Sequence, residues 1–374
     1  MSDRVEELTA LREQVRALVR RWKDEERFEA RPDAWGRGYD RDFSREMGKE
    51  GFIGITWPER FGGAGRSNLD RLAITEELLR SGAPVAAHWI ADRQIGPAIL
   101  RYGTPELQEE LLPGIAAGEL TFCLGMSETE AGSDLAAVRT TATPTDDGWV
   151  ISGSKVWTTQ AHRSEYAYVL ARTDSSGDKH EGLTEFIVDM RAEGVETRPI
   201  IDLQGEHHFN EVHFDNVKVP AHYVIGEVGN GWKQVTDQLA FERGGAERIL
   251  STYLVLEELL RALEGTEDDV ALEGVAGLVA EVTALRRMVW EIAILMDRGQ
   301  APIVEAAMLK FLGTRYEETL ARTARYLVEE APRPPSGALS GMIGDALMAA
   351  PGGLIRGGSA GVMLGIIARA EVKR

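Results

Sequence analysis

The chain has 374 residues, 43% of them hydrophobic and 27% charged, and its formal net charge is -18. The length suggests two or three domains, and the apolar fraction is that of a globular protein with a large core. The acidic balance argues against nucleic acid or an anionic membrane surface as a partner. An anionic ligand is still possible, because backbone N–H groups and a few cations can bind phosphates.

The composition also limits the compartment and the metal chemistry. The one cysteine, Cys123, excludes an internal disulfide and a cysteine-rich zinc site. The pair His207-His208 lacks a third ligand at suitable spacing, so we interpret it as a surface loop and expect no metal. The sequence has no continuous apolar run of membrane-spanning length and no signal-peptide core. We therefore expect a cytoplasmic protein without membrane insertion.

The hydrophobic pattern changes its period twice along the chain. From Glu6 to about Gly118, apolar residues recur at three- and four-residue spacing, which predicts helices, among them Leu69–Leu79 and Pro105–Ala116. From about Thr121 to Ile225, apolar and polar residues alternate between turn sequences, which predicts strands. The order is therefore helices followed by a compact β-domain.

From Asn230 onward the pattern is helical again. We expect one long helix from Asn230 to about Leu263, with Ala331–Gly337 as a helix-breaking linker further on. The other helices are expected near Val275–Asp297, Pro302–Glu330 and Gly344–Ala350.

A stretch in the β-domain, Phe122–Thr159, has the features of a cofactor site. Its Gly-Ser-Asp turn exposes backbone N–H groups and a hydroxyl, which suit a polar or anionic cofactor edge. The hairpin that follows ends in Trp157, a flat apolar surface, beside the hydroxyls of Thr158 and Thr159. A planar ring system with heteroatoms at its rim needs this combination. Composition alone leaves such a ring system as one possibility among several.

Glu242 is the candidate for catalysis, because it lies within an apolar stripe of the long helix. The stripe is formed by Trp232, Val235, Leu239, Ala246, Ile249 and Tyr253. Burial should raise the pKa of a carboxylate on this face toward neutrality, which suits a general base. Gly244-Gly245 costs about 1 kcal/mol per glycine in mid-helix, which is tolerated where the backbone must approach a neighbour or ligand closely. Helical spacing does not exclude a solvated or ion-paired glutamate at the stripe's margin.

Several ordered blocks resemble the acyl-CoA dehydrogenase family. Met126–Asp134, MSETEAGSD, followed by Gly153–Thr159, GSKVWTT, resembles its flavin-binding signature. The further blocks are Trp57–Gly65, Arg101–Glu119, Glu211–Pro220, Ile225–Trp232 and Ile366–Arg369. The resemblance covers nearly the whole chain and implies a mainly α-helical protein with a central β-barrel domain. The expected domains are a helical one over 1–119, the β-barrel over 120–228, and a helical one over 229–374.

The resemblance implies FAD as the cofactor and gives roles to individual residues. The flavin-binding positions are Leu124, Met126, Ser127, Gly132, Ser133, Trp157, Thr158, Thr159 and Ser359. Trp157 should lie against the ring, Thr159 near its N5 atom, and Ser133 also near the pantetheine arm of the substrate. The substrate-binding positions are Ser133, Phe241 and Arg243.

The resemblance also implies a mechanism. Family members take their catalytic glutamate either from a C-terminal Glu-Gly-Thr or, in the isovaleryl and long-chain branches, from the mid-chain helix just before an arginine. Here Gly357 occupies the first position, while Glu242-Arg243 matches the second. Glu242 should then remove the α-proton of an acyl-CoA thioester while flavin N5 accepts the β-hydride, giving a 2-enoyl-CoA. The backbone N–H of Gly357 should hold the thioester carbonyl, and an electron-transfer flavoprotein should reoxidise the flavin.

The chain departs from the family pattern where FAD is anchored. The Gly-Gly-x-Gly segment for the diphosphate is absent, and Leu263–Gly277 and Ser359–Val362 replace other usual stretches. In the family the adenosine half of FAD is shared between subunits, so a partner chain can supply the anchor. This resembles actinobacterial members that act on sterol-type acyl-CoAs and contain two kinds of chain. We expect a homo-oligomer, either a dimer or a tetramer, that binds FAD without a second kind of chain. Three alternatives stay open: a catalytic chain of a hetero-oligomer, a non-catalytic or co-catalytic subunit, and a flavin oxidase or monooxygenase.

Overall fold

The computed structural model describes residues 2–329 and 336–372, with the side chains of Ser2 and of residues 239–242 outside the description. The chain forms two compact units, each built from segments that are distant in the sequence. The helical unit comprises residues 1–38, 66–84 and 240–374, and the sheet unit comprises residues 39–65 and 85–239. We describe each unit by itself.

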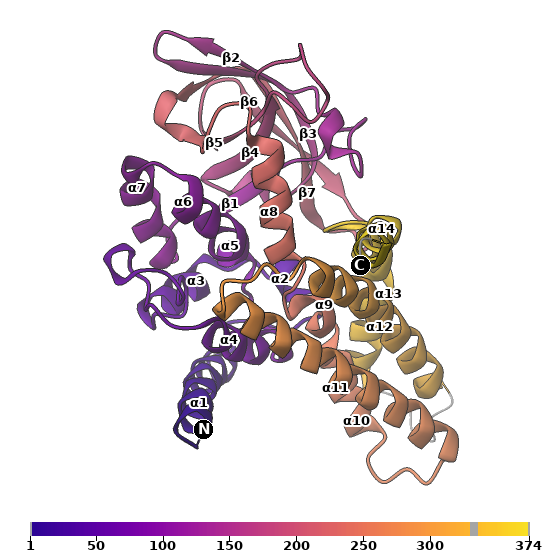
Figure 1. Ribbon diagram of the computed structural model, residues 1–374. Coiled ribbons are helices and arrows are strands. Elements are labelled where there is room, and N and C mark those ends of the chain that lie inside the picture. The colour runs from indigo at the N-terminus through magenta and orange to yellow at the C-terminus, as the bar shows by residue number, and fades with distance from the viewer. Residues whose placement is uncertain (1, 330–335, 373–374) are drawn as a thin grey trace. The chain divides into compact units, whose positions relative to one another are not determined.

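The helical unit contains most of the long helices (Figure 1). Its elements are α1 (Ser2–Asp24), α2 (Ala34–Arg37), α4 (Asn68–Arg80), α9 (Glu247–Leu250), α10 (Tyr253–Ala262), α11 (Asp269–Asp297), α12 (Ile303–Glu329), α13 (Gly337–Ile355) and α14 (Ala360–Val372). Helix α12 packs against α11, α13 and α14, while α4 packs against α1 and α11. The predicted helix at Leu69–Leu79 corresponds to α4, whose N-terminus is stabilised by a capping box between Ser67 and Asp70.

Buried carboxylates on α4 join three helices of this unit. Glu76 accepts from Arg12 of α1 and, at 2.6 Å, from Nε of Arg286 of α11. Glu77 accepts from Arg12 at 2.8 Å and from Nε of Arg16 at 2.7 Å. Burial alone would raise the pKa of both carboxyls, but these guanidinium partners outweigh it and lower both values. The helices are therefore held by matched charges as well as by apolar contact.

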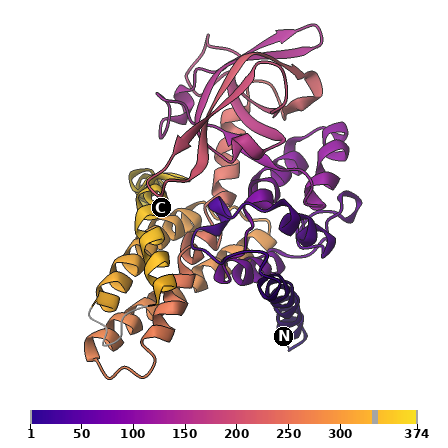
Figure 2. The same ribbon diagram turned by 180° about the vertical axis from the view of Figure 1, so that it is seen from behind.

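The sheet unit contains one eight-stranded sheet, which is seen from two sides in Figure 1 and Figure 2. Its strands are β1 (Phe122–Gly125), β2 (Thr141–Thr145), β3 (Gly148–Thr159), β4 (Tyr166–Arg172), β5 (Leu183–Asp189), β6 (Val195–Ile201), β7 (His207–Pro220) and β8 (Val224–Ile225). The strand order is β6-β7-β3-β2-β4-β5-β8, with β1 paired parallel to β4. Strands β4 and β5 are buried along most of their length, whereas β7 alternates between buried and half-buried positions.

Short helices complete the sheet unit. They are α3 (Arg41–Lys49), η1 (Glu59–Phe61), α5 (Ala86–Ile90), η2 (Ala91–Ile95, a π-helical turn), α6 (Gly96–Tyr102), α7 (Pro105–Ala116), η3 (Leu135–Ala137), η4 (Ala161–Arg163) and η5 (Ala221–Tyr223). Helix α8 (Gly231–Glu242) begins in this unit. The predicted helix at Pro105–Ala116 is α7, whose first turn is capped by the Thr104 hydroxyl. The predicted arrangement of helices around a central β-domain is confirmed.

The predicted long helix from Asn230 to Leu263 is wrong. It is divided into α8, α9 and α10, and residues 243–246 form turns between the first two. The break falls at Gly244-Gly245, where a Cβ on Gly244 would lie 2.8 Å from Cγ2 of Ile292 in α11. Glycine allows this close approach at the cost of helix continuity. The stripe that contained Glu242 therefore does not run along a single helix.

Two other expectations also differ from the structure, and a third lies mostly outside the described residues. His207-His208 is not a surface loop: both residues start β7, and His208 is only 5% exposed. The helix expected near Gly344–Ala350 is longer and extends over all of α13, and α14 follows it. Of the linker expected at Ala331–Gly337, residues 331–335 lie outside the described residues, while Ser336 caps α13.

Helix α13 is unusually apolar and poorly covered. Its most apolar 18-residue window has a mean hydropathy of 1.3, and only 17% of that window is buried. Among the described helices it alone is long and apolar enough to cross a membrane, which by itself is weak evidence for a membrane span. The sequence expectation of no membrane insertion rested on continuous apolar runs and did not single out this helix.

Candidate functional site

The predicted flavin loop leaves the sheet at the end of β1 and returns along β3. Leu124 lies in β1 opposite Tyr168 of β4, and Met126 packs against an apolar cluster that includes Leu170. The Ser127 carbonyl accepts from the Val156 N–H of β3 at 2.9 Å. Gly132 and Ser133 are exposed, and a Cβ on Gly132 would meet no atom within 4 Å. This loop therefore offers open space beside a well-fixed backbone.

Trp157 and Thr158 lie next to this loop, and Trp157 has an unusual backbone conformation. Trp157 has φ +61° and is 58% exposed, and its described ring contact is an edge-on one with Phe209 at 5.8 Å. The β3–β7 register shifts between Lys155 and Thr158, so Trp157 stands at an irregularity in the strand. A large residue with positive φ is strained and commonly marks a functional position. Trp157 is therefore not a residue of the sheet core.

Thr158 carries an unpaired polar group. Its side chain is 1% exposed, and its hydroxyl oxygen has no hydrogen-bond partner within the described chain. Its carbonyl accepts from Nδ2 of Asn210 at 3.0 Å, so the backbone is fixed while the hydroxyl is free. A buried unsatisfied hydroxyl costs about 1–3 kcal/mol unless a ligand or water meets it. Thr159 follows half-buried at the end of β3.

These features of the sheet unit fit a flavin. An exposed indole supplies an apolar face, the Thr158 hydroxyl supplies a polar contact, and the open turn at Gly132 leaves room for a ring edge. Nearby, His162 stacks on His207 with ring centroids 3.9 Å apart, and burial together with His207 lowers the pKa of His162 to about 4. A neutral His162 beside this face does not add charge to it.

The second group of predicted residues lies in the turn between α13 and α14 of the helical unit. Gly357 has φ +70° and Gly358 has φ +111°, both in the region that favours glycine. A Cβ at residue 357 would lie 3.0 Å from the guanidinium of Arg248, a residue that is only 5% exposed. Arg243 donates from Nε to the Gly357 carbonyl at 3.0 Å. The side-chain space at position 357 is therefore occupied by an arginine.

The turn is also fixed by the residue before it. Arg356 donates to both oxygens of Asp33, at 3.0 and 2.6 Å, and its guanidinium lies 4.3 Å from the centroid of the Trp35 ring. Such a two-pronged pair holds both partners in one orientation. The Gly357 N–H donates to no acceptor among the described residues, whereas the Gly358 N–H bonds the Ile355 carbonyl. Ser359 follows, and its carbonyl accepts from the Met363 N–H of α14.

The remaining predicted residues are at the end of α8. Phe241 and Glu242 are helical, but their side chains lie outside the described residues. Each unit thus brings together its own set: the loop and hairpin residues in one, and Arg243, Gly357 and Ser359 in the other. Sequence reasoning missed the contacts that fix both sets, namely Glu128 with Lys155 and Asp33 with Arg356. A charged residue inside an alternating strand, such as Lys155, was the available signal for the first.

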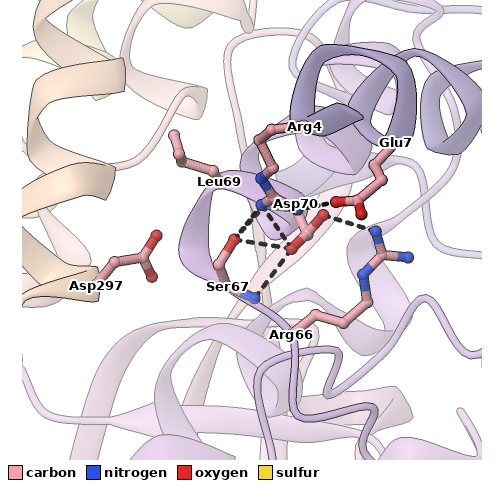
Figure 3. Close-up of a pocket in the computed structure, with 7 residues that line it drawn as sticks. All are labelled: Arg4, Glu7, Arg66, Ser67, Leu69, Asp70 and Asp297. Atoms are coloured by element: carbon pink, nitrogen blue, oxygen red, sulfur yellow. Dashed lines mark hydrogen bonds and ion pairs between the residues drawn. The ribbon is translucent and has the colours of Figure 1, made fainter. Parts of the chain in front are cut away.

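The helical unit has a shallow surface depression that contains none of the predicted residues (Figure 3). Its lining residues are Arg4, Glu7, Arg66, Ser67, Leu69, Asp70 and Asp297. Asp70 accepts from Arg4 at 2.9 Å and from Arg66 at 2.8 Å. Burial opposes the charge, but the bonds from Arg4 and Ser67 lower the pKa of Asp70 to about 2. The cluster is internally satisfied and joins α1 to α4.

Comparison with known proteins assigns the fold and the family. Three family models match: the acyl-CoA dehydrogenase N-terminal domain over residues 5–119, the middle domain over 123–217, and the C-terminal domain over 229–372. Among solved structures, the Tcur3481-Tcur3483 steroid ACAD is similar with a TM-score of 0.88 and 28% identity, over 99% of this chain and 98% of that one. The ChsE4-ChsE5 complex from Mycobacterium tuberculosis is similar with a TM-score of 0.84 and 29% identity, over 100% of this chain and 98% of that one. The predicted fold class is confirmed.

Curated relatives agree with these structures. Acyl-CoA dehydrogenase IpdE1 of Mycobacterium tuberculosis is 36% identical over 291 residues, which are 74% of this chain and 75% of IpdE1. FadE29 of the same organism is 32% identical over 86% of this chain and 85% of FadE29. FadE34, also from that organism, is 39% identical over 287 residues, but the match spans only 39% of its length. The chain belongs to the acyl-CoA dehydrogenase family of flavoprotein oxidoreductases.

Proposed function

We propose that this chain catalyses the α,β-dehydrogenation of an acyl-CoA thioester to a 2-enoyl-CoA with bound FAD. Glu242 removes the α-proton, and the N–H of Gly357 donates to the thioester carbonyl, where negative charge develops. FAD, when bound, supplies the acceptor for the β-hydride. Arg243 keeps the Gly357 peptide in place through its bond to the carbonyl of the same residue. Phe241 and Ser133 contact the substrate in this proposal.

The observation that carries the proposal is the Gly357 turn. Its N–H has no acceptor in the part of the chain that the structure describes, so it is available to a carbonyl oxygen. The turn from Ile355 to Ser359 contains no acidic residue. Arg248 lies 3.0 Å from where a Cβ at position 357 would be, so this arginine occupies the space that a side chain there would need. The base must therefore come from another element, and Glu242 is the acid that the family resemblance offers.

The cofactor contacts are proposed for the sheet unit. Trp157 packs against the isoalloxazine ring, Thr158 and Thr159 bond its edge, and the loop from Leu124 to Ser133 lies along it. The exposed indole and the unpaired Thr158 hydroxyl support this arrangement. Met126, Ser127 and Gly132 contribute backbone or hydroxyl contacts from the loop, and Ser359 contributes from the helical unit.

For the substrate we propose a bulky acyl group of the steroid type. The support is the similarity to a solved complex whose name describes a steroid ACAD. A panel of short, long, branched and steroid-type acyl-CoAs tests this, with flavin bleaching as the readout. Preference for a short straight chain contradicts the assignment. An electron-transfer flavoprotein as electron acceptor and a cytoplasmic location follow from the family expectation and are proposed with it.

We propose that the chain works in an oligomer. Helices α13 and α14 expose apolar side chains: Ile355 is 67% exposed, Leu364 47% and Met348 42%. Large apolar side chains this exposed are characteristic of surfaces that another protein chain covers. Light scattering on the purified protein should give a dimer or tetramer, and a monomer at micromolar concentration contradicts the proposal.

A second candidate is a subunit whose partner completes the FAD site. The similarity to two structures with paired names, Tcur3481-Tcur3483 and ChsE4-ChsE5, favours this candidate. A chain that purifies yellow by itself supports the self-sufficient enzyme. A colourless chain that turns yellow only with a second chain supports the heteromer.

The test of the base is Glu242→Gln. The variant should keep its flavin but lose bleaching by acyl-CoA, because an amide does not accept the α-proton at neutral pH. Glu264→Gln, at an exposed position just after α10, is the matched control and should bleach like the wild-type protein. Undiminished bleaching by Glu242→Gln refutes the assignment of the base.

A further inference from the structure

A buried ion pair lies beneath the loop that we propose binds flavin. Lys155 of β3 has a fully buried side chain, and its Nζ lies 2.8 Å from Oε1 of Glu128 in the loop. The same Nζ donates to the Met126 carbonyl at 3.1 Å. The lysine therefore fixes the loop through a side chain and through the backbone at once.

Glu128 extends this attachment to a third segment. Its Oε2 accepts from the Arg139 N–H at 2.6 Å, and its Oε1 accepts from the Thr140 N–H at 2.9 Å, just before β2. Its own backbone pairs with Ala131 through two hydrogen bonds of 3.0 and 3.1 Å. One carboxylate thus joins the loop, the start of β2 and the middle of β3.

Burying these two charges costs desolvation free energy, so a gain in stability does not by itself explain why the pair is buried. Burial lowers the pKa of Lys155 to about 8 even with Glu128 beside it. Burial by itself raises the pKa of Glu128, but Lys155 and the two backbone donors outweigh it and lower the value. Replacing a buried ion pair by apolar residues is often neutral for stability, so burial of charge does not by itself account for this arrangement. A charged network does specify one geometry, because each partner has a defined direction.

We infer that the Glu128–Lys155 pair is a positioning device for the flavin loop, which holds Met126 through Ser133 in the conformation that binds the isoalloxazine edge. The inference rests on the proposed function, since it assumes that this loop contacts FAD. Binding to a loop that is already ordered avoids the entropy cost of ordering it during binding. Both residues act through the backbone of the loop and are not assigned contacts with the cofactor.

The experiment uses the double variant Glu128→Gln with Lys155→Met, which removes both charges and keeps the approximate shape. The matched control is Glu196→Gln with Arg198→Met. It removes an exposed ion pair of 2.9 Å on β6, away from the flavin loop, with side chains 60% and 56% accessible. FAD is titrated into each apo-protein by flavin fluorescence, and hydrogen–deuterium exchange is followed in the peptides that cover residues 124–140 without FAD.

The expected result is a FAD dissociation constant at least tenfold higher for the buried-pair variant, with faster exchange in the loop. The control should stay within twofold of the wild-type protein in both measurements. If the wild-type protein binds FAD and the buried-pair variant binds it equally well, the inference is overturned and the proposed function stands. If the wild-type chain binds no FAD by itself, the self-sufficient form of the proposed function fails, and the inference fails with it.

Glu128→Asp covers the case in which the double variant does not fold. Its carboxylate is one methylene shorter and does not reach Lys155 and both backbone donors together. It should weaken FAD binding by several-fold with the melting temperature of the apo-protein nearly unchanged. Unchanged FAD binding by a folded Glu128→Asp protein overturns the inference.

Discussion

Trp157 provides the sharpest prediction, because the conformational cost of its backbone and its proposed stacking on FAD can be tested separately. The residue has φ +61°, is 58% exposed, and touches Phe209 only edge-on at 5.8 Å. A left-handed conformation costs a non-glycine residue about 1–2 kcal/mol. Little packing in the apo-protein offsets that cost. The indole is therefore better explained by a ligand that stacks on it.

Two substitutions separate strain from stacking. Trp157→Ala removes the ring and keeps the strained backbone, whereas Trp157→Gly removes both. Glycine gains about 1–2 kcal/mol from the left-handed region and loses about 0.5–1 kcal/mol to chain entropy. Trp157→Gly should thus be more stable than Trp157→Ala by about 1 kcal/mol. Both variants should bind FAD roughly tenfold or more weakly, since a stacked aromatic contact contributes about 1 kcal/mol beyond its buried area.

The assay is urea unfolding of each apo-protein together with FAD titration by fluorescence. Trp157→Phe is the control, because it keeps a flat ring and should retain most of the affinity. FAD binding by Trp157→Ala at wild-type affinity refutes the proposed stacking. Equal stability of the alanine and glycine variants refutes the argument about strain.

The other predictions concern three further positions. Gly357→Ala should lower the unfolding free energy by about 1 kcal/mol or more, because its φ is +70° and a Cβ would lie 3.0 Å from Arg248. Gly344→Ala, inside α13 with no atom within 4 Å of its Cβ, should raise it by about 0.5–1 kcal/mol in the same assay. Burial raises the pKa of Glu185 from 4.5 to about 7, so its folded form binds a proton more tightly than its unfolded form. This group by itself should therefore lower the free energy of unfolding by roughly 3 kcal/mol as pH rises from about 4.5 to 7. Glu317, whose pKa desolvation also raises to about 7, acts in the same direction, whereas His162 and His88, whose pKa values burial lowers to about 4, act in the opposite direction. Glu185→Gln should therefore gain stability relative to the wild-type protein as pH rises over this range, which shifts the slope of unfolding free energy against pH toward positive values. An unchanged slope contradicts the assignment.

The sequence predicted the elements whose signals are local. Helix α7 begins and ends where the apolar spacing indicated, and Trp157–Thr159 forms the end of a hairpin strand as expected. The long helix through Gly244 was predicted wrongly, because the approach of Ile292 that breaks it comes from a different part of the chain. His208 was predicted in a surface loop because no third metal ligand stands at suitable spacing, yet it lies in β7.

The sequence predicted which residues form the candidate site, but not the ion pairs that hold them in place. The flavin loop and the glycine at position 357 could be located from the order of motifs. The pair of Lys155 with Glu128 joins residues 27 apart, and that of Arg356 with Asp33 joins residues 323 apart. No periodicity in one sequence reports such contacts, since they depend on how strands and helices pack.

The central claim is that the carboxylate of Glu242 acts on the α-carbon of a bound thioester while Gly357 holds its carbonyl. A crystal structure of the protein with FAD and an unreactive acyl-CoA thioether tests this most directly. The account predicts a Glu242 oxygen within about 3–3.5 Å of the carbon that corresponds to the α-carbon. A Glu242 side chain directed into solvent, with another acid beside that carbon, contradicts the account.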